Sequence, residues 1–143
     1  MKKNKLYPVR EAFGKNEKKI ILELVNYYFK KKIDPPYHGK YEKKLSTYFA
    51  KYMNSGYSLP VATGTSAAYV AIQSFFLKKN SEILITPVND SGPLNCIINL
   101  NLKPKVMDSK TMNYNSGLKQ IKERISKKTK LVYVAHIGGQ SAE

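Results

Sequence analysis

Residues 60–72 read Pro60-Val61-Ala62-Thr63-Gly64-Thr65-Ser66-Ala67-Ala68-Tyr69-Val70-Ala71-Ile72. An extended segment, residues 57–62, precedes a turn of small residues, and an apolar helix begins directly after the turn. The N-terminus of a helix carries backbone N–H groups without internal partners and the positive end of the helix dipole, so it favours an anion. Gly64 has no Cβ to keep a ligand from the backbone, and Thr65 and Ser66 add hydroxyl groups. The turn Gly64-Thr65-Ser66 is therefore a candidate phosphate site.

The same turn also fits an ordinary helix start, because Thr and Ser are favoured N-caps and Gly is common in turns. The stretch matches neither the Walker A pattern nor the Gly-x-Gly-x-x-Gly pattern of Rossmann domains, so neither kind of nucleotide site has motif support. The rest of the chain favours the phosphate interpretation.

Length and composition limit the class of protein. At 143 residues the chain is one domain, or most of one. No apolar run is long enough to span a membrane, and the basic start is not followed by the apolar region of a secretory signal. The single cysteine, Cys96, lies in an apolar segment, where we expect a buried and inert thiol. These features fit a cytoplasmic protein without an internal disulfide.

The net charge is +15, yet only Arg10 and Arg124 among the 25 basic residues are arginines. Proteins that bind nucleic acids favour arginine for bidentate contacts with bases and phosphates. The lysines are spread along the chain, mostly at the ends or on the polar faces of predicted helices, so we interpret them as solvated surface. A basic nucleic-acid-binding domain is the alternative, and a steep salt dependence of DNA affinity would be its signature.

Two amphipathic helices are predicted before the phosphate turn. In residues 16–32 the apolar side chains recur on one helical face, with Asn16 as the expected cap, and Asp34-Pro35-Pro36 ends the pattern. A second helix is predicted at residues 41–52, and Asn54-Ser55-Gly56 supplies residues able to adopt a positive φ at its end. Residues 2–13 show no period and are expected to form an extended arm.

Beyond residue 57 the pattern alternates between helices and strands. We expect helices at residues 65–79, 93–102 and 116–126, and strands at residues 82–86, 105–107 and 131–135. The first of these helices is apolar on most sides, which predicts burial within a domain or a dimer. Alternation of this kind predicts an α/β fold, with helices on the faces of a mostly parallel sheet.

The predicted organisation is an N-terminal arm with two helices in residues 1–56, and part of an α/β domain in residues 57–143. Ligands of parallel sheets bind at the carboxyl ends of the strands. The phosphate turn, the loop at Asn89-Asp90 and the loop at His136 are expected at that edge. His136 is expected to be a structural hydrogen-bonding residue, and His38 a surface residue. We expect no metal site, because no cluster of metal-ligating residues is present, and no catalytic set of nucleophile and base is readable.

Several segments match a family pattern in order and at nearly the right spacing. They are Phe13-Gly14 with Glu17, Gly39 with Tyr41-Glu42, Tyr48-Phe49-Ala50-Lys51-Tyr52, Thr63-Gly64-Thr65-Ser66-Ala67-Ala68, Ser81-Glu82-Ile83-Leu84-Ile85-Thr86-Pro87, Pro104-Lys105-Val106-Met107-Asp108, Lys128-Thr129-Lys130-Leu131-Val132 and His136-Ile137-Gly138-Gly139. The chain resembles the N-terminal part of the DegT/StrS-type sugar aminotransferases, which are pyridoxal-phosphate enzymes of aminotransferase fold type I. The segment that begins at Thr63 resembles the family's Asn-Gly-Thr-Ser-Ala-Leu phosphate turn.

This resemblance implies a function for the whole enzyme. It implies pyridoxal phosphate as the cofactor, with Gly64, Thr65 and Ser66 as its phosphate-binding residues. It implies transfer of an amino group from an amino-acid donor to a keto sugar nucleotide in polysaccharide biosynthesis, by a homodimer without a membrane span.

The departures from the family pattern also matter. The family has a ring that stacks on the cofactor in the loop after Pro87, but residues 89–93 contain no aromatic residue. The family's Schiff-base lysine and pyridinium aspartate lie downstream of residue 143. We therefore expect a truncated chain that is inactive alone, and we assign no catalytic residue. A degenerate binding or scaffold protein of the same fold is the alternative. We also expect the chain to self-associate, because its helices carry ring-rich faces.

Overall fold

The structure is a computed structural model that describes residues 13–142. The arm expected at residues 2–13 lies outside the described residues, apart from Phe13. The chain divides into two compact units, of which the first ends at Ser58 and the second begins at Leu59. Within the described part of the chain, no helix is both long enough and apolar enough to cross a membrane.

The first unit contains α1 (Lys15–Lys31) and α2 (Lys40–Tyr52), each starting one residue before its predicted position. The expected cap at Asn16 is wrong, because Gly14 is the N-cap of α1 and its N–H donates to Glu17 Oε2 at 2.8 Å. Asn54 takes a φ of 50° just after α2, as predicted.

The apolar face predicted for α1 exists, but it is not covered. No residue of α1 is buried, and Phe29 is 81% exposed. In α2 only Ala50 is buried.

The second unit is built on a parallel sheet of three strands in the order β2-β1-β3. The strands are β1 (Glu82–Ile85), β2 (Lys103–Val106) and β3 (Thr129–Tyr133). The prediction of a parallel sheet is confirmed, although β2 and β3 each begin two residues earlier than predicted. Residues 57–62 form no strand.

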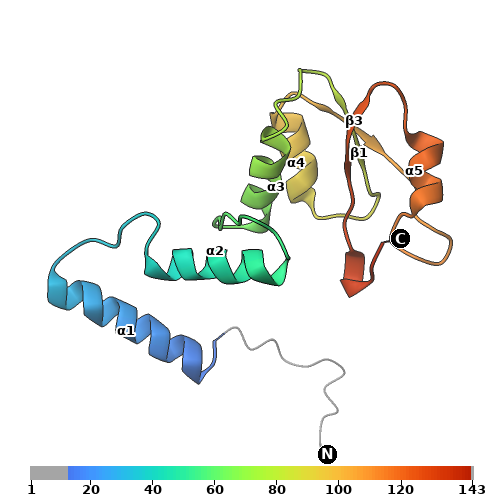
Figure 1. Ribbon diagram of the computed structural model, residues 1–143. Coiled ribbons are helices and arrows are strands. Elements are labelled where there is room, and N and C mark those ends of the chain that lie inside the picture. Colours follow the sequence, from blue (N-terminus) through green and yellow to red (C-terminus); the bar gives the residue numbers. More distant parts are fainter. Residues whose placement is uncertain (1–12, 143) are drawn as a thin grey trace, which may run out of the picture. The chain divides into compact units, whose positions relative to one another are not determined.

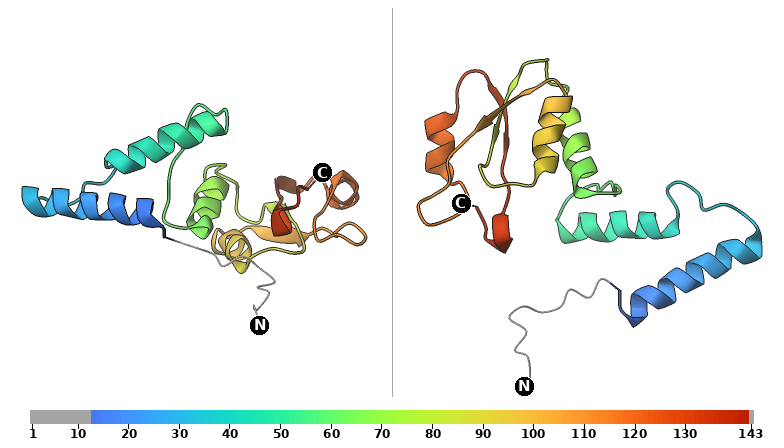
Figure 2. Two further views of the ribbon diagram at one scale, coloured as in Figure 1. Left: turned by 90° about the horizontal axis from the view of Figure 1, so that it is seen from below. Right: turned by 180° about the vertical axis from the view of Figure 1, so that it is seen from behind.

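Three helices cover this sheet: α3 (Gly64–Gln73), α4 (Ser91–Asn99) and α5 (Leu118–Arg124). Figures 1 and 2 show α3 and α4 on one face of the sheet and α5 on the opposite face. All three helices begin at the end of the unit where the strands end (Figure 1). The carboxyl edge of the sheet therefore gathers the starts of the helices and the loops that follow the strands.

The helix after the phosphate turn is shorter than predicted. It ends at Gln73, where the prediction extended to residue 79. The Ser74 hydroxyl donates to the Ala71 carbonyl oxygen at 2.8 Å, and Phe76 takes a φ of 48°, which turns the chain toward β1. Only Ala68 and Ile72 of α3 are buried, and Phe76 is 86% exposed. Within this unit α3 is therefore buried on one side only, and burial of its other sides in a dimer stays a prediction.

The core lies between the sheet and the pair α3 and α4. Its buried residues are Ala68, Ile72, Ile83, Ile85, Cys96, Ile97 and Leu102. Cys96 is 3% exposed, so the predicted burial of its side chain is confirmed. The apolar sequence of β1 fits this position, because the central strand of a parallel sheet is buried on both faces.

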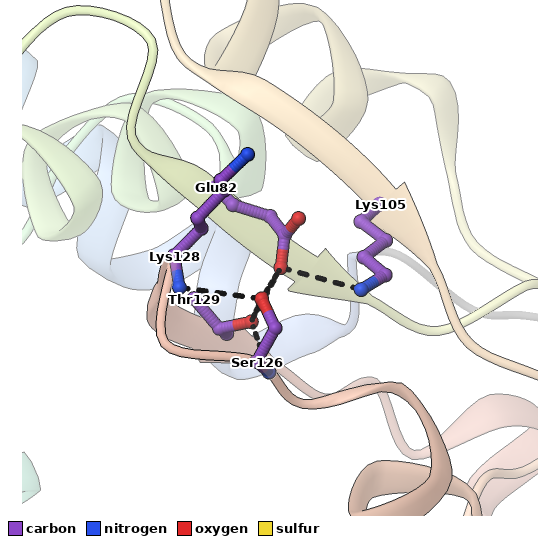
Figure 3. Close-up of polar contacts among 5 residues, drawn as sticks. All are labelled: Glu82, Lys105, Ser126, Lys128 and Thr129. Carbon is purple, nitrogen blue, oxygen red and sulfur yellow. Dashed lines mark hydrogen bonds and ion pairs between the residues drawn. The ribbon is translucent and has the colours of Figure 1, made fainter.

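A polar cluster joins the three strands at the opposite edge of the sheet (Figure 3). Glu82 Oε1 accepts hydrogen bonds from the hydroxyls of Thr129 at 2.5 Å and Ser126 at 3.1 Å, and lies 3.5 Å from Lys105 Nζ. The hydrogen bond from Thr129 is the largest influence that lowers the pKa of Glu82 below its usual value, and it outweighs partial burial. This cluster fastens β2 and β3 to the start of β1.

Candidate functional site

The turn before α3 is held by its own N-cap. The Thr63 hydroxyl accepts the N–H of Ser66 at 3.0 Å and lies 2.9 Å from the Ser66 hydroxyl. The Thr63 carbonyl accepts the N–H of Ala67 at 3.0 Å, and Gly64 is the first residue of the helix. Sequence analysis identified the turn, but it did not predict that Thr63 is the cap.

Capping changes which amides are available to a ligand. The Ser66 N–H is already bonded to Thr63, whereas the N–H groups of Gly64 and Thr65 have no acceptor within residues 13–142. Gly64 and Thr65 are also exposed, while Ser66 is half-buried. Of the predicted phosphate turn Gly64-Thr65-Ser66, the free backbone donors are therefore those of Gly64 and Thr65, because the Ser66 N–H is used by the cap.

The backbone of Gly64 faces open space. A Cβ placed on Gly64 would meet no other atom within 4 Å, and the residue does not require a positive φ. The protein itself therefore does not need glycine here for packing. A ligand can therefore approach the backbone at Gly64 without meeting a side chain of that residue.

The second helix at this edge, α4, positions Thr65. Cys96 Sγ lies 3.5 Å from the Thr65 carbonyl oxygen, within the weak hydrogen-bonding range of a thiol. A Cβ on Gly92 would overlap Thr65 Oγ1, so the absence of a side chain at Gly92 lets the two helix starts approach. Sequence analysis assigned no role to Gly92, because the partner of a small residue in another helix is not visible in the sequence.

The loop after β1 lies at the expected edge, with its polar groups engaged locally. Thr86 is buried and its N–H donates to the Tyr133 carbonyl at 3.3 Å. Asn89 Nδ2 donates to Thr86 Oγ1 at 3.4 Å, and Asp90 caps α4 by accepting the Gly92 N–H at 3.0 Å. These contacts hold the loop between the ends of β1 and β3.

The segment after β3 is anchored by Asn115, which sequence analysis missed. Its Oδ1 accepts the N–H of Ile137 at 2.8 Å, and its Nδ2 donates to the carbonyls of Gln140 at 3.1 Å and Ile137 at 3.4 Å. His136 Nδ1 accepts the N–H of Ala142 at 2.9 Å, which agrees with the predicted structural role of this histidine.

Other candidate groups stay outside this site. His38 is exposed and pairs with Glu42 at 2.8 Å on α2. Across the described residues, no group of three or more His, Cys, Asp or Glu side chains is arranged to hold a metal ion. Every described lysine except Lys105 and Lys110 is exposed, which supports the interpretation of the lysines as solvated surface.

Residues 18–143 match the family model described as the DegT/DnrJ/EryC1/StrS aminotransferase family. The chain belongs to this family. The family resemblance noted in the sequence is thereby confirmed. A curated relative, GDP-perosamine synthase of Vibrio cholerae, is 25% identical over 105 residues, which are 73% of this chain and 29% of the relative. The chain thus spans about 29% of the length of that relative.

Solved structures show the same fold. The aminotransferase from Psychrobacter cryohalolentis matches with a TM-score of 0.80 at 20% identity, over 95% of this chain and 33% of that chain. E. coli GDP-4-keto-6-deoxy-D-mannose-3-dehydratase with bound hydrated PLP matches with a TM-score of 0.76 at 26% identity, over 88% of this chain and 33% of that chain. The predicted α/β aminotransferase fold is confirmed by these matches together with the parallel sheet.

Proposed function

We propose that this chain is part of the cofactor-binding domain of a pyridoxal-phosphate-dependent enzyme that acts on keto sugar nucleotides. Its role is to hold the cofactor phosphate at the start of α3. The observation that carries the proposal is the pair of backbone N–H groups at the exposed residues Gly64 and Thr65, which have no acceptor among the described residues. The identity of the anion is supported by family membership and by structural neighbours whose structures contain PLP or PMP.

The residues of the turn fit a phosphate. The amides of Gly64 and Thr65 donate to phosphate oxygens, and the positive end of α3 adds to the attraction. The Thr63–Ser66 cap keeps the first turn of α3 in place before any ligand binds, so little ordering is needed on binding. The cofactor, when bound, supplies an electron sink for the chemistry, while the protein binds and orients it.

For the whole protein we propose transfer of an amino group from an amino-acid donor to a keto sugar nucleotide, in polysaccharide biosynthesis. The names of the relatives support this substrate class, since GDP-perosamine synthase and GDP-4-keto-6-deoxy-D-mannose-3-dehydratase are both enzymes of GDP-linked sugars. The match to the dehydratase favours dehydration of the same class of substrate as a second candidate reaction. A homodimer in the cytoplasm remains part of the proposal.

The test is a titration of the isotope-labelled chain followed by amide NMR. Pyridoxine 5′-phosphate is the probe, because it carries the phosphate but lacks the aldehyde that would react with exposed lysines. Pyridoxine without phosphate is the comparison ligand. We expect pyridoxine 5′-phosphate and inorganic phosphate to shift the amides of Gly64 and Thr65, and pyridoxine to leave them unchanged.

A matched pair of variants assigns the effect to the turn. Gly64→Ala adds a methyl group where the protein has open space but a phosphate would bind, so we expect a native fold and weaker phosphate binding. Gly56→Ala adds the same group where a Cβ also meets nothing within 4 Å, away from the turn, and should bind as the unmodified chain does. Unchanged affinity in Gly64→Ala would contradict the proposed site.

A further inference from the structure

Tyr133 is the last residue of β3 and lies beside the loop that follows β1. It pairs with Ile85, and its carbonyl accepts the N–H of Thr86 at 3.3 Å. Its side chain packs against the core cluster that α3 and α4 form with the sheet. The ring of Tyr133 therefore lies on the face covered by α3 and α4. Tyr133 ends β3, and α3 and α4 begin at the edge of the sheet where the strands end (Figure 1).

The hydroxyl of Tyr133 has no hydrogen-bond partner within the described part of the chain, although the residue is half-buried. Because the described residues hold no buried side-chain oxygen without a partner, this hydroxyl reaches the surface, where it is open to water or to a ligand. Burial is the largest influence that raises the pKa of Tyr133 above its usual value, and electrostatic interactions with its neighbours raise it further. The phenol is consequently a neutral donor at physiological pH.

Cys96 connects this tyrosine with the phosphate turn. Cys96 Sγ lies 3.5 Å from the Thr65 carbonyl oxygen, and Cys96 belongs to the core cluster against which Tyr133 packs. Asp90 caps α4 beside Gly92, and Gly92 abuts Thr65. Tyr133 and Thr65 thus both border the core cluster that contains Cys96, although they are distant in the sequence.

We propose that Tyr133 is a ligand-binding residue of this site, whose ring and hydroxyl contact the aromatic ring of the cofactor when its phosphate lies at Gly64 and Thr65. This inference rests on the proposed function. A phosphate-bearing aromatic ligand presents both a flat face for the ring and polar atoms for the hydroxyl. The loop at residues 89–93 contains no aromatic residue, and Tyr133 brings one to the same edge from the neighbouring strand.

The test compares two ligands on three proteins. Tyr133→Phe removes only the hydroxyl and keeps the packed ring, and Tyr114→Phe is the control, because Tyr114 is 69% exposed on another loop. Tyr133→Phe should bind pyridoxine 5′-phosphate about three- to tenfold more weakly, as expected for the loss of one hydrogen bond. Its affinity for inorganic phosphate should not change, and Tyr114→Phe should match the unmodified chain with both ligands.

A second measurement needs no folded variant. In the unmodified chain, pyridoxine 5′-phosphate should shift the ring signals of Tyr133, and inorganic phosphate should leave them in place. If both ligands shift the Gly64 and Thr65 amides while the Tyr133 ring signals and the affinity of Tyr133→Phe stay unchanged, the inference is overturned and the phosphate site stands. If neither ligand shifts those amides, the proposed function fails, and the role of Tyr133 fails with it.

Discussion

Replacing Asn115 with alanine tests whether one buried side chain fixes the segment after β3. Asn115 is 1% exposed, and its amide joins residues that lie 22 and 25 positions further along the chain. The segment it holds contains Gly138 and Gly139, both with positive φ. Glycines lose much conformational freedom on folding, so this segment depends on the hydrogen bonds of Asn115 to stay ordered.

The magnitude follows from the hydrogen bonds. Two are short, at 2.8 Å to the Ile137 N–H and 3.1 Å to the Gln140 carbonyl, and each contributes about 1 kcal/mol net. The third, at 3.4 Å, is long and contributes less. Alanine also leaves the Ile137 N–H without its acceptor, so we expect Asn115→Ala to lower the free energy of unfolding by about 2–3 kcal/mol. That is a large part of the ~5–15 kcal/mol of a typical domain.

Urea unfolding measures the free energy, and hydrogen exchange of the Ile137 amide reports the local effect. Asn115→Ala should unfold at lower urea with an unchanged m-value, and its Ile137 amide should exchange faster. Asn95→Ala is the control, because Asn95 is exposed on α4 and alanine suits a helix. A loss below about 0.5 kcal/mol, the range of ordinary surface substitutions, together with unchanged exchange at Ile137, would refute this role of Asn115.

Three further predictions concern other parts of the chain. Gly92→Ala should lower the free energy of unfolding by about 1–3 kcal/mol, because the added methyl group overlaps Thr65 Oγ1. Gly64→Ala should not lower it, since a Cβ there meets no atom within 4 Å. Equal melting temperatures for the two variants would contradict this packing. Glu82→Gln should lower the free energy of unfolding at neutral pH. The folded-state pKa of Glu82 is lowered, so its contribution is present above the ordinary value of 4.5 and is lost as the pH falls below it. Urea unfolding at several pH values should therefore show the two proteins converging in acid, and a pH-independent difference would argue against the cluster in Figure 3. The chain should self-associate at moderate salt, where charge repulsion is screened, through the uncovered face of α1. Val25→Lys should reduce this association in size-exclusion chromatography with light scattering, and a monomer for the unmodified chain at both low and moderate salt would contradict the prediction.

The sheet was predictable because its signals are local. The apolar run at residues 82–86 and the alternation of strands with helices require only near neighbours in the sequence. The end of α3 was not predictable in this way, because Ser74 bonds back to Ala71 and Phe76 turns left-handed against the preference of a bulky residue. Helical periodicity continues past residue 73, but it carries no information on that turn.

In the candidate site, too, local sequence predicts some features and does not reveal others. The turn at Gly64 and Thr65 is a contiguous segment, and its relation to a helix start is visible in the sequence. The contacts of Asn115 with residues 137–140, of Gly92 with Thr65, and of Tyr133 with the loop after β1 join residues far apart in the chain. A single sequence does not reveal such pairs, since each residue type is common in loops or strands for other reasons.

The most direct test of the central claim is a crystal structure of the chain with pyridoxine 5′-phosphate. We predict phosphate density within hydrogen-bonding distance of the Gly64 and Thr65 nitrogen atoms, with the bond from the Ser66 N–H to the Thr63 hydroxyl preserved. The account is contradicted if the ligand binds elsewhere while these two amides remain free, or if the Gly64 and Thr65 amides bond to another part of the protein.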